Sequence, residues 1–248
     1  DLADARAADI DQVSLFGDDD QEQAQAPQWL PATPWSPRQR LQEEKAALGL
    51  FLSGHLFDDC AAEVRKFART RLSDLQPQPQ PVWLAGIVSA QRTQMTRRGK
   101  MLFVRLDDGS AAIEVSVFSE TLEAQRAVVR EDELLVVFGK VSKDDFTGGL
   151  RVVAERLLEL SEARSEFGKR LQLVAPGGVD VALLRSVLLP FAAQDNSAQG
   201  TLPVVVVYLN GSAGCSIELG GPWRVRPDDA LLAELRERLR PKSAAVEY

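Results

Sequence analysis

The sequence predicts a mixed α and β protein whose central segment, Val82–Leu158, closes into a five-stranded β-barrel. Short apolar runs bounded by turn residues follow one another through this segment, as strands do. A helix-prone stretch, Glu120–Val129, stands between the third and the fourth run, and Ser119 can cap it. Five strands with a helix between the third and the fourth is the order of an OB-fold barrel. The expected strands are Val82–Ala90, Met101–Leu106, Ile113–Phe118, Leu134–Val141 and Leu150–Leu158.

The first expected strand shows the period of two that is typical of burial on one face. Its even-numbered residues from Val82 to Val88 alternate with odd-numbered residues that would face the other side. Gly86 interrupts this strand. We expect Gly86 to mark a bulge or a sharp bend, because a small closed barrel needs such a bend.

Around the barrel, the composition indicates three further parts. Residues 1–37 are rich in Asp, Gln, Ala and Pro without a sustained period, which is typical of a disordered tether. Residues 38–76 predict a helical adaptor with helices over Arg38–Leu52 and Asp58–Arg69, and residues 77–160 hold the barrel. Residues 161–248 predict a small α+β domain after a polar, helix-prone connector, Glu159–Gly168. Its expected elements are strands Arg170–Val174, Leu202–Leu209, Cys215–Leu219 and Trp223–Val225, and helices Asp180–Phe191 and Pro227–Arg240.

The net charge of −7 is concentrated at the start of the chain. Residues 1–28 hold eight acidic residues and one basic residue, which leaves 28 of each in the remainder. The folded part is therefore neutral overall, and its charge does not exclude nucleic-acid binding. No apolar run approaches the roughly 20 residues that span a bilayer, so no membrane contact is expected. Cys60 and Cys215 lack metal-ligand spacing, which favours a reduced, cytoplasmic protein.

A short motif, Gln12-Val13-Ser14-Leu15-Phe16, interrupts the acidic tether. Leu15 and Phe16 have the chemistry to enter an apolar pocket of a partner, and Gln12 can supply orienting hydrogen bonds. The alternative is a stray apolar pair in a disordered segment. Because the chain begins with Asp1 and not with Met, we also expect it to be a fragment of a longer polypeptide.

A basic loop, Arg92–Lys100, is the strongest indication of a ligand in the barrel. It carries Arg92, Arg97, Arg98 and Lys100 and no acidic residue. The loop between the first two strands of an OB fold borders its nucleic-acid groove, so these charges could contact the phosphates of single-stranded DNA. Phe103 or Phe118 could stack on bases. The alternatives are a solvated hairpin tip and two core phenylalanines.

Several stretches taken together resemble the C-terminal part of the bacterial replicative DNA polymerase III alpha subunit, in order and over essentially the whole chain. The block with Leu48-Gly49 and Ser53-Gly54-His55 is the most specific, although Leu56 stands where the family usually has Pro. The stretches that carry the resemblance are Gln12–Phe16, Glu44–His55, Leu106–Gly109, Gly139–Ser142, Asp144–Leu150 and Trp223–Val225.

The resemblance implies three partners. In the family, the equivalent of Gln12–Phe16 binds the sliding clamp, the OB domain lies near the template single strand, and the last domain binds the tau subunit of the clamp loader. The polymerase carboxylates of the family lie upstream of this region. Asp107-Asp108 and Asp144-Asp145 stand in expected turns of the barrel, and the only histidine, His55, has no cluster of ligands around it. We therefore expect no catalytic residue, metal site or cofactor in this chain, and no polymerase activity.

Three alternatives stay open. The barrel could be an RNA- or tRNA-binding OB module appended to an enzyme, although this leaves the clamp-like motif unexplained. It could be a scaffold that touches no nucleic acid. The parent could also be the error-prone paralogue of the polymerase, which shares the barrel.

Overall fold

The structure is a computed structural model that describes residues 34–96, 99–125, 128–144, 148–176, 180–193, 200–210, 213–238 and 244–248. The chain divides into two units, Asp1–Ser36 and Pro37–Tyr248, and all the elements described below belong to the second. Gln12, Leu15 and Phe16 lie outside the described residues, as do Arg97 and Arg98.

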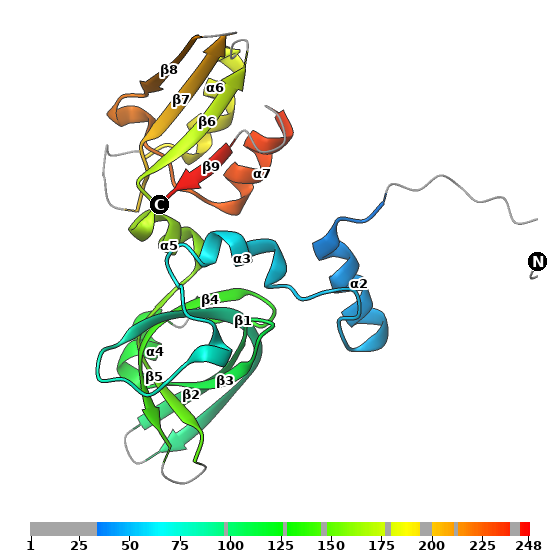
Figure 1. Cartoon of the computed structure of the whole chain (residues 1–248), viewed down its shortest axis with the longest axis vertical. Coiled ribbons are helices and arrows are strands. Elements are labelled where there is room, and N and C mark those ends of the chain that lie inside the picture. The colour runs from blue at the N-terminus through cyan, green and yellow to red at the C-terminus, as the bar shows by residue number, and fades with distance from the viewer. Residues whose placement is uncertain are drawn as a thin grey trace, which may run out of the picture. The chain divides into compact units, whose positions relative to one another are not determined.

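Five strands close into the barrel that the sequence predicts (Figure 1). The strands are β1 (Val82–Thr96), β2 (Gly99–Asp107), β3 (Ala112–Val117), β4 (Leu134–Lys143) and β5 (Leu150–Leu158). They are hydrogen-bonded in the order β1-β2-β3-β5-β4, and a helix, α4 (Ser119–Gln125), separates β3 from β4 in the sequence. The pairing is antiparallel except between β3 and β5. The OB-fold prediction is therefore confirmed.

The bend at Gly86 is required by a close approach of two backbones. The first part of β1 pairs with β4 over Val82–Ile87, and the second part pairs with β2 over Ile87–Thr96. At the crossing, a Cβ atom on Gly86 would lie 2.9 Å from the carbonyl oxygen of Asp107. Only glycine fits there without a shift of the backbone. The irregularity of register lies a little further on, between Val88 and Ala90.

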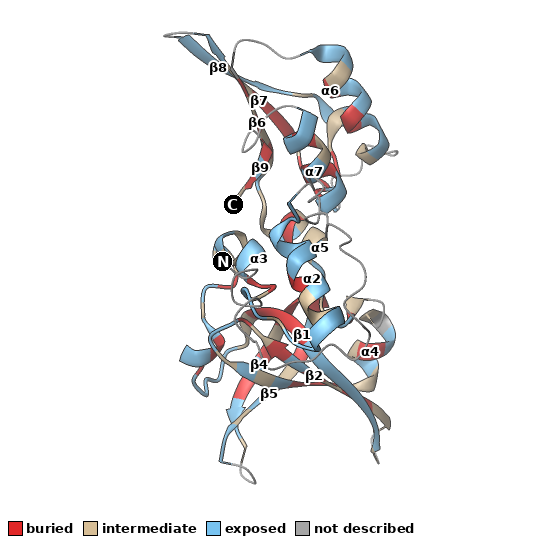
Figure 2. Cartoon of the chain, turned by 90° about the vertical axis from the view of Figure 1, so that its right-hand side faces the viewer, coloured by how far each residue is buried: buried red, intermediate tan, exposed pale blue. Residues whose placement is uncertain are grey.

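Both faces of the first part of β1, as far as Val88, are buried where one buried face was expected. Leu84 and Val88 belong to the core inside the barrel, whereas Ala85 and Ile87 belong to a second core outside it. Two helices, α3 (Asp58–Val64) and α5 (Leu160–Phe167), contribute to that second core (Figure 2). The one-face prediction is therefore wrong for this strand, because helices cover the side that was assigned to solvent.

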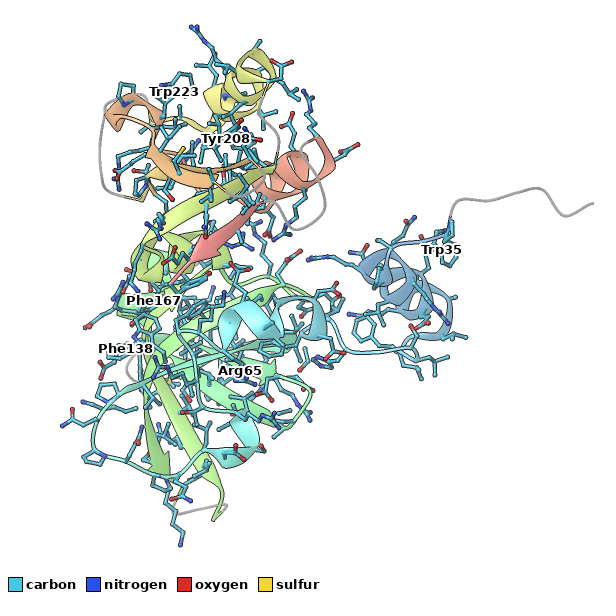
Figure 3. The ribbon with its side chains drawn as sticks, turned by 45° about the horizontal axis from the view of Figure 1, so that its top comes forward. Trp35, Arg65, Phe138, Phe167, Tyr208 and Trp223 are labelled. Carbon is cyan, nitrogen blue, oxygen red and sulfur yellow. The ribbon has the colours of Figure 1, made fainter. Side chains whose placement is uncertain are left out.

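An aromatic row lies between the outside of the barrel and these helices. The Trp83 ring packs against Phe138 and Phe167, with ring centroids 4.8 and 4.9 Å away. Phe138 and Phe167 are labelled in Figure 3. The Phe167 ring stacks in turn on Phe67 at 5.0 Å, and Phe67 packs against Tyr248 at 5.5 Å. The row therefore links the barrel, the helical segment and the last residue of the chain.

The helical segment is shorter than predicted. Helix α2 spans Pro37–Leu48 and ends before Leu52, because Gly49 adopts a positive φ of 77° and donates its N–H to the Lys45 carbonyl. The Glu44 carboxylate accepts the backbone N–H groups of Leu52 and Ser53 at 2.8 and 2.9 Å, and this holds the following residues in a turn. Helix α3 ends at Val64 where a helix to Arg69 was expected, and a short 3₁₀ helix, η1, spans Leu72–Asp74.

The remaining chain forms a four-stranded sheet in the order β8-β7-β6-β9. Its elements are β6 (Arg170–Pro176), α6 (Val181–Leu188), η3 (Leu189–Phe191), β7 (Val204–Asn210), β8 (Ala213–Glu218), η4 (Gly221–Trp223), α7 (Asp229–Arg238) and β9 (Ala244–Glu247). Alternate residues of β6 and β7 share a core with α6 and α7, whereas all six residues of β8 are exposed (Figure 2).

Three expectations for this sheet need correction. The stretch Trp223–Val225 is not a strand, since η4 ends at Trp223 and Val225 makes only isolated bridges. The β7 strand is central, as predicted, but it is not covered to its end, because Leu209 is 42% exposed. Strand β9 was not expected at all.

Within the described ranges, no helix has the length and apolar content needed to cross a lipid bilayer.

Candidate nucleic-acid interface

The basic segment after the first expected strand is largely a hairpin and not a loop. Strand β1 continues to Thr96 and β2 begins at Gly99, so two of the charged positions, Arg92 and Lys100, belong to strands. The ladder pairs Arg92 with Phe103 and Thr96 with Gly99, and the Thr96 hydroxyl donates to the Gly99 carbonyl at 2.9 Å. The loop prediction is wrong because the ladder with β2 continues this far.

Phe103 points to the outside of the barrel. Its neighbours on β2, Leu102 and Val104, are buried in the barrel core, whereas Phe103 itself is half-buried. Side chains of successive strand residues alternate between the two faces, so Phe103 lies on the outer face. In OB folds, the face formed by the second and third strands binds oligonucleotides. The other candidate, Phe118, directly precedes α4, and its carbonyl accepts the N–H of Leu122 at 2.8 Å.

Arg92, Phe103 and Glu114 form one contact group across three strands, which we call the Arg92 cluster. The Arg92 Cζ atom lies 4.2 Å from the centroid of the Phe103 ring. The same guanidinium group donates to both carboxylate oxygens of Glu114, at 3.1 and 3.2 Å. The Arg92 and Glu114 side chains are 60% and 52% exposed, so a ligand can reach both. The cluster places a planar cation over an aromatic ring, and proteins that bind single strands use both kinds of group, the cation for phosphates and the ring for bases.

Further cations lie in the strands around the cluster. Arg105 is exposed and pairs with Glu114 in the ladder between β2 and β3. Arg151 is exposed near the start of β5, one residue before the Val152 that pairs with Val115 of β3. Lys100 is half-buried and pairs with Met95. Such dispersed charges suit weak, salt-dependent contacts with phosphates.

Asp108 ties the helical segment to the barrel. Its side chain is fully buried, and one carboxylate oxygen accepts from Ser110 and Ala111. The other accepts the Leu72 N–H at 3.0 Å and a hydrogen bond from the Arg65 guanidinium. Burial raises the pKa of Asp108, but the hydrogen bonds from Ser110, Leu72 and Arg65 outweigh it and lower the pKa to about 2. Both carboxylate oxygens of Asp108 are therefore engaged in hydrogen bonds that hold the helical segment and the turn after β2 together.

His55 has a similar linking position. Its Nδ1 atom accepts the Phe57 N–H at 3.1 Å, and its Nε2 atom lies 3.3 Å from the Asp107 carboxylate. Asp107 also accepts the N–H of Gly109 at 2.9 Å. Among the described residues, no group of three or more His, Cys, Asp and Glu side chains is arranged to hold a metal ion. The geometry of His55 therefore serves to join the turn after α2 to the barrel.

Sequence reasoning missed a buried charge in the connector Glu159–Gly168. This stretch is helix α5, and Arg164 within it is only 3% exposed. Its guanidinium donates to both Glu63 carboxylate oxygens at 2.9 Å, to Asp229 at 2.6 Å and to the Pro227 carbonyl at 3.1 Å. Burial lowers the pKa of Arg164, but Glu63 and Asp229 outweigh it, and the pKa is raised. No pattern in the sequence distinguishes this arginine from solvated ones.

Two sequence families match parts of the chain. Residues 82–160 match the family described as OB-fold nucleic acid binding domain. Residues 186–239 match the family described as DNA polymerase III subunit alpha, C-terminal domain. The fold and the first of these matches define residues 82–160 as an OB-fold domain.

Curated relatives give the particular family. The chain is 37% identical over 251 residues to the DNA polymerase III subunit alpha of Neisseria meningitidis serogroup B, which covers 100% of the chain and 21% of the relative. It is 37% identical over 213 residues to that of Pseudomonas aeruginosa, with 85% and 18% covered, and 31% identical over 250 residues to that of Escherichia coli K12, with 98% and 21% covered. The chain therefore belongs to the DNA polymerase III alpha family as a C-terminal part of such a subunit, and it spans about a fifth of the length of these relatives.

Solved structures resemble part of the chain only distantly. The second OB-fold domain of replication protein A from Methanococcus maripaludis is 16% identical, covers 37% of this chain and 93% of its own, and has a TM-score of 0.30. The yeast mitochondrial single-stranded DNA binding protein Rim1 is 17% identical, covers 33% and 93%, and has a TM-score of 0.28. These scores are too low to support an inference about function.

Proposed function

We propose that this chain is a non-catalytic binding region of the polymerase alpha subunit, which holds the polymerase on the sliding clamp, on the tau subunit and on template single-stranded DNA during replication. The observation that carries the DNA contact is the Arg92 cluster. It presents a guanidinium group over an aromatic ring on the outer face of β2 and β3, where OB folds bind oligonucleotides. Arg92, Arg97, Arg98, Lys100 and Phe103 are the proposed DNA-contacting residues.

The clamp contact is assigned to Gln12, Leu15 and Phe16. Its support is the chemistry of the motif, which offers two adjacent apolar side chains and one amide within an acidic segment. A short peptide of this kind binds weakly by itself. When it is joined to a second contact in the same chain, the effective concentration of the polymerase at its primer end rises.

The tau contact is assigned to residues 161–248, with residues 38–76 as the helical adaptor and 77–160 as the DNA-binding domain. The support is the resemblance of the chain to alpha subunits, together with a separate apolar core in the last part. In this scheme each contact is weak enough for the polymerase to leave one clamp and move to another. We place the protein in the cytoplasm, where its free thiols at Cys60 and Cys215 would stay reduced.

The alternative that competes most closely is an RNA- or tRNA-binding module, since that class also uses the OB fold. A competition experiment separates the two proposals. Fluorescence anisotropy with a labelled oligo-dT of about 12 nucleotides should show weak binding that decreases with salt. Unlabelled DNA of the same length should then compete at least as well as RNA. A clear preference for RNA, or no binding to either at low salt, would contradict the proposed function. Binding to purified tau would count against the error-prone paralogue.

A further inference from the structure

One face of the Phe103 ring is covered by Arg92 in this structure. The Arg92 guanidinium lies over it, 4.2 Å from its centroid, and this is the separation of a direct contact. A base cannot stack on that face while the guanidinium is there. The proposed function assigns both the Phe103 ring and the Arg92 guanidinium to DNA. A base can reach this face of the ring only after Arg92 has moved.

Glu114 holds Arg92 in that position. In the ladder Arg92 lies opposite Phe103 on β2, and Arg105, two residues further along β2, lies opposite Glu114 on β3. The side chain of Arg92 must therefore cross β2 above Phe103 to reach the Glu114 carboxylate on the next strand. The two hydrogen bonds of 3.1 and 3.2 Å fix the guanidinium in this crossing position. The Glu114 carboxylate thus takes up hydrogen-bond donors of Arg92 that a phosphate would otherwise use.

We propose that Glu114 is a built-in competitor of the DNA phosphate, and that displacement of Glu114 uncovers Phe103 for a base. This inference rests on the proposed single-stranded DNA function. A phosphate of the incoming strand takes over the Arg92 guanidinium, Arg92 swings away from the ring, and a base stacks on the Phe103 face that it leaves. The freed Glu114 carboxylate can turn to Arg105, its exposed neighbour in the ladder.

The exchange has two consequences for binding. One ion pair replaces another, so the phosphate contact contributes little net affinity, and Glu114 continues to repel the phosphate backbone. The base stack becomes available only together with the phosphate contact, so a ligand that offers both an accessible phosphate and an unpaired base is favoured over one that offers either alone. Glu114 therefore keeps the site weak and rapidly reversible, which suits a polymerase that must move along its template.

The test uses Glu114→Gln in the full chain. The amide has nearly the same shape and cannot form the ion pair, so we expect the affinity for a labelled oligo-dT to rise about three- to tenfold at fixed low salt. The gain should be lost when Phe103→Leu is added. Fluorescence of a 2-aminopurine base in the oligonucleotide should change more on binding to Glu114→Gln than to Glu114→Gln with Phe103→Leu, because that signal reports stacking.

Glu133→Gln is the matched control. Glu133 also accepts two hydrogen bonds from one arginine, Arg38, at 3.0 and 3.1 Å, and both side chains are about half exposed. Glu133 directly precedes β4, and its partner Arg38 belongs to α2, away from the Arg92 cluster, so its substitution should change the affinity less than twofold. Suppose that the wild type binds the oligo-dT. If the affinity of Glu114→Gln is then unchanged or lower, or if Glu133→Gln gains as much affinity as Glu114→Gln, the competitor role is overturned and the proposed DNA binding stands. If neither the wild type nor Glu114→Gln binds, the proposed DNA function itself fails.

Discussion

The hydroxyl group of Tyr248 donates a hydrogen bond of 2.6 Å to Glu63, a residue of α3 that precedes it by 185 positions. Glu63 also accepts two hydrogen bonds from the buried Arg164. Burial raises the pKa of Glu63, but the Arg164 guanidinium and the Tyr248 hydroxyl outweigh it and lower the pKa. Burial and the neighbouring Glu63 raise the pKa of Tyr248. The last residue of the chain, the connector helix α5 and the helical segment are thus joined through one carboxylate.

Removal of that carboxylate should destabilise the protein strongly. Glu63→Ala leaves Arg164 buried without its main partner, and we expect the free energy of unfolding to fall by about 3 to 5 kcal/mol. Urea denaturation followed by circular dichroism measures this change. Glu133→Ala, which breaks an exposed pair with Arg38, should cost less than about 1 kcal/mol. Similar losses in the two variants would show that the Glu63 contacts are no stronger than a surface pair.

The Tyr248 hydroxyl should contribute less, because its loss leaves no buried charge unpaired. We expect Tyr248→Phe to lower the free energy of unfolding by about 1 kcal/mol, since the ring remains to pack against Phe67. The same denaturation curves measure it. A loss as large as that of Glu63→Ala would mean that the hydroxyl, and not Arg164, is the main partner of Glu63.

The lowered pKa of Asp108 predicts that the protein loses stability in acid. Its pKa is about 2 in the folded protein and about 3.9 in an unfolded chain, so the unfolded state takes up the proton first as the pH falls. The stabilisation is therefore complete above about pH 4 and is lost as the pH falls towards 2. Asp108→Asn should flatten this part of the pH profile of the melting temperature. A variant with the same acid slope as the wild type would exclude Asp108 as the titrating group.

The clamp motif predicts a loss of binding without a loss of fold. In Leu15→Ala with Phe16→Ala both proposed apolar contacts are removed, so surface plasmon resonance against immobilised clamp should show no binding. The melting temperature should be unchanged. Ile10→Ala, which removes an apolar side chain before the motif, is the control and should bind as the wild type does. Retained affinity in the double variant would refute the assignment.

The charges of the β1–β2 hairpin should set the salt dependence of DNA binding. When Arg97, Arg98 and Lys100 are changed to Gln, affinity for oligo-dT should fall, and the slope of log affinity against log salt should decrease by about 2. Arg69, Arg71 and Arg185 are exposed elsewhere and provide a control triple variant with the same change of charge. An unchanged slope in the hairpin variant, or an equal change in the control, would remove these residues from the interface.

The sequence predicts the barrel well because its strands carry a local period and their order is diagnostic. It predicts the ends of elements poorly. The helix over 38–52 stops at Leu48 because of the backbone geometry of Gly49 and the bonds to Glu44. Neither feature is visible as a break in the apolar spacing, since Leu52 continues that spacing although it is exposed in the structure.

Contacts between residues that are far apart in the sequence could not be predicted either, because the sequence pattern does not show which of them the fold brings together. Glu114 is an ordinary exposed strand residue in the sequence, and only the register of β1, β2 and β3 brings it to Arg92. Arg164 and Asp108 likewise look like solvated charges until Glu63 and Arg65 are placed beside them. Residue types and their order thus predicted a DNA-binding face, whereas the contact of Glu114 with Arg92 follows only from the pairing of the strands.

The most direct measurement of the central proposal, a DNA-binding face on the barrel, is a nuclear magnetic resonance titration of the ¹⁵N-labelled full chain with oligo-dT at low salt. We expect the largest shift changes in the amides of the β1–β2 hairpin and around Phe103 and Glu114, and small changes in β6 to β9. Shift changes confined to the sheet of β6 to β9, or none at all, would contradict a DNA-binding face on this barrel.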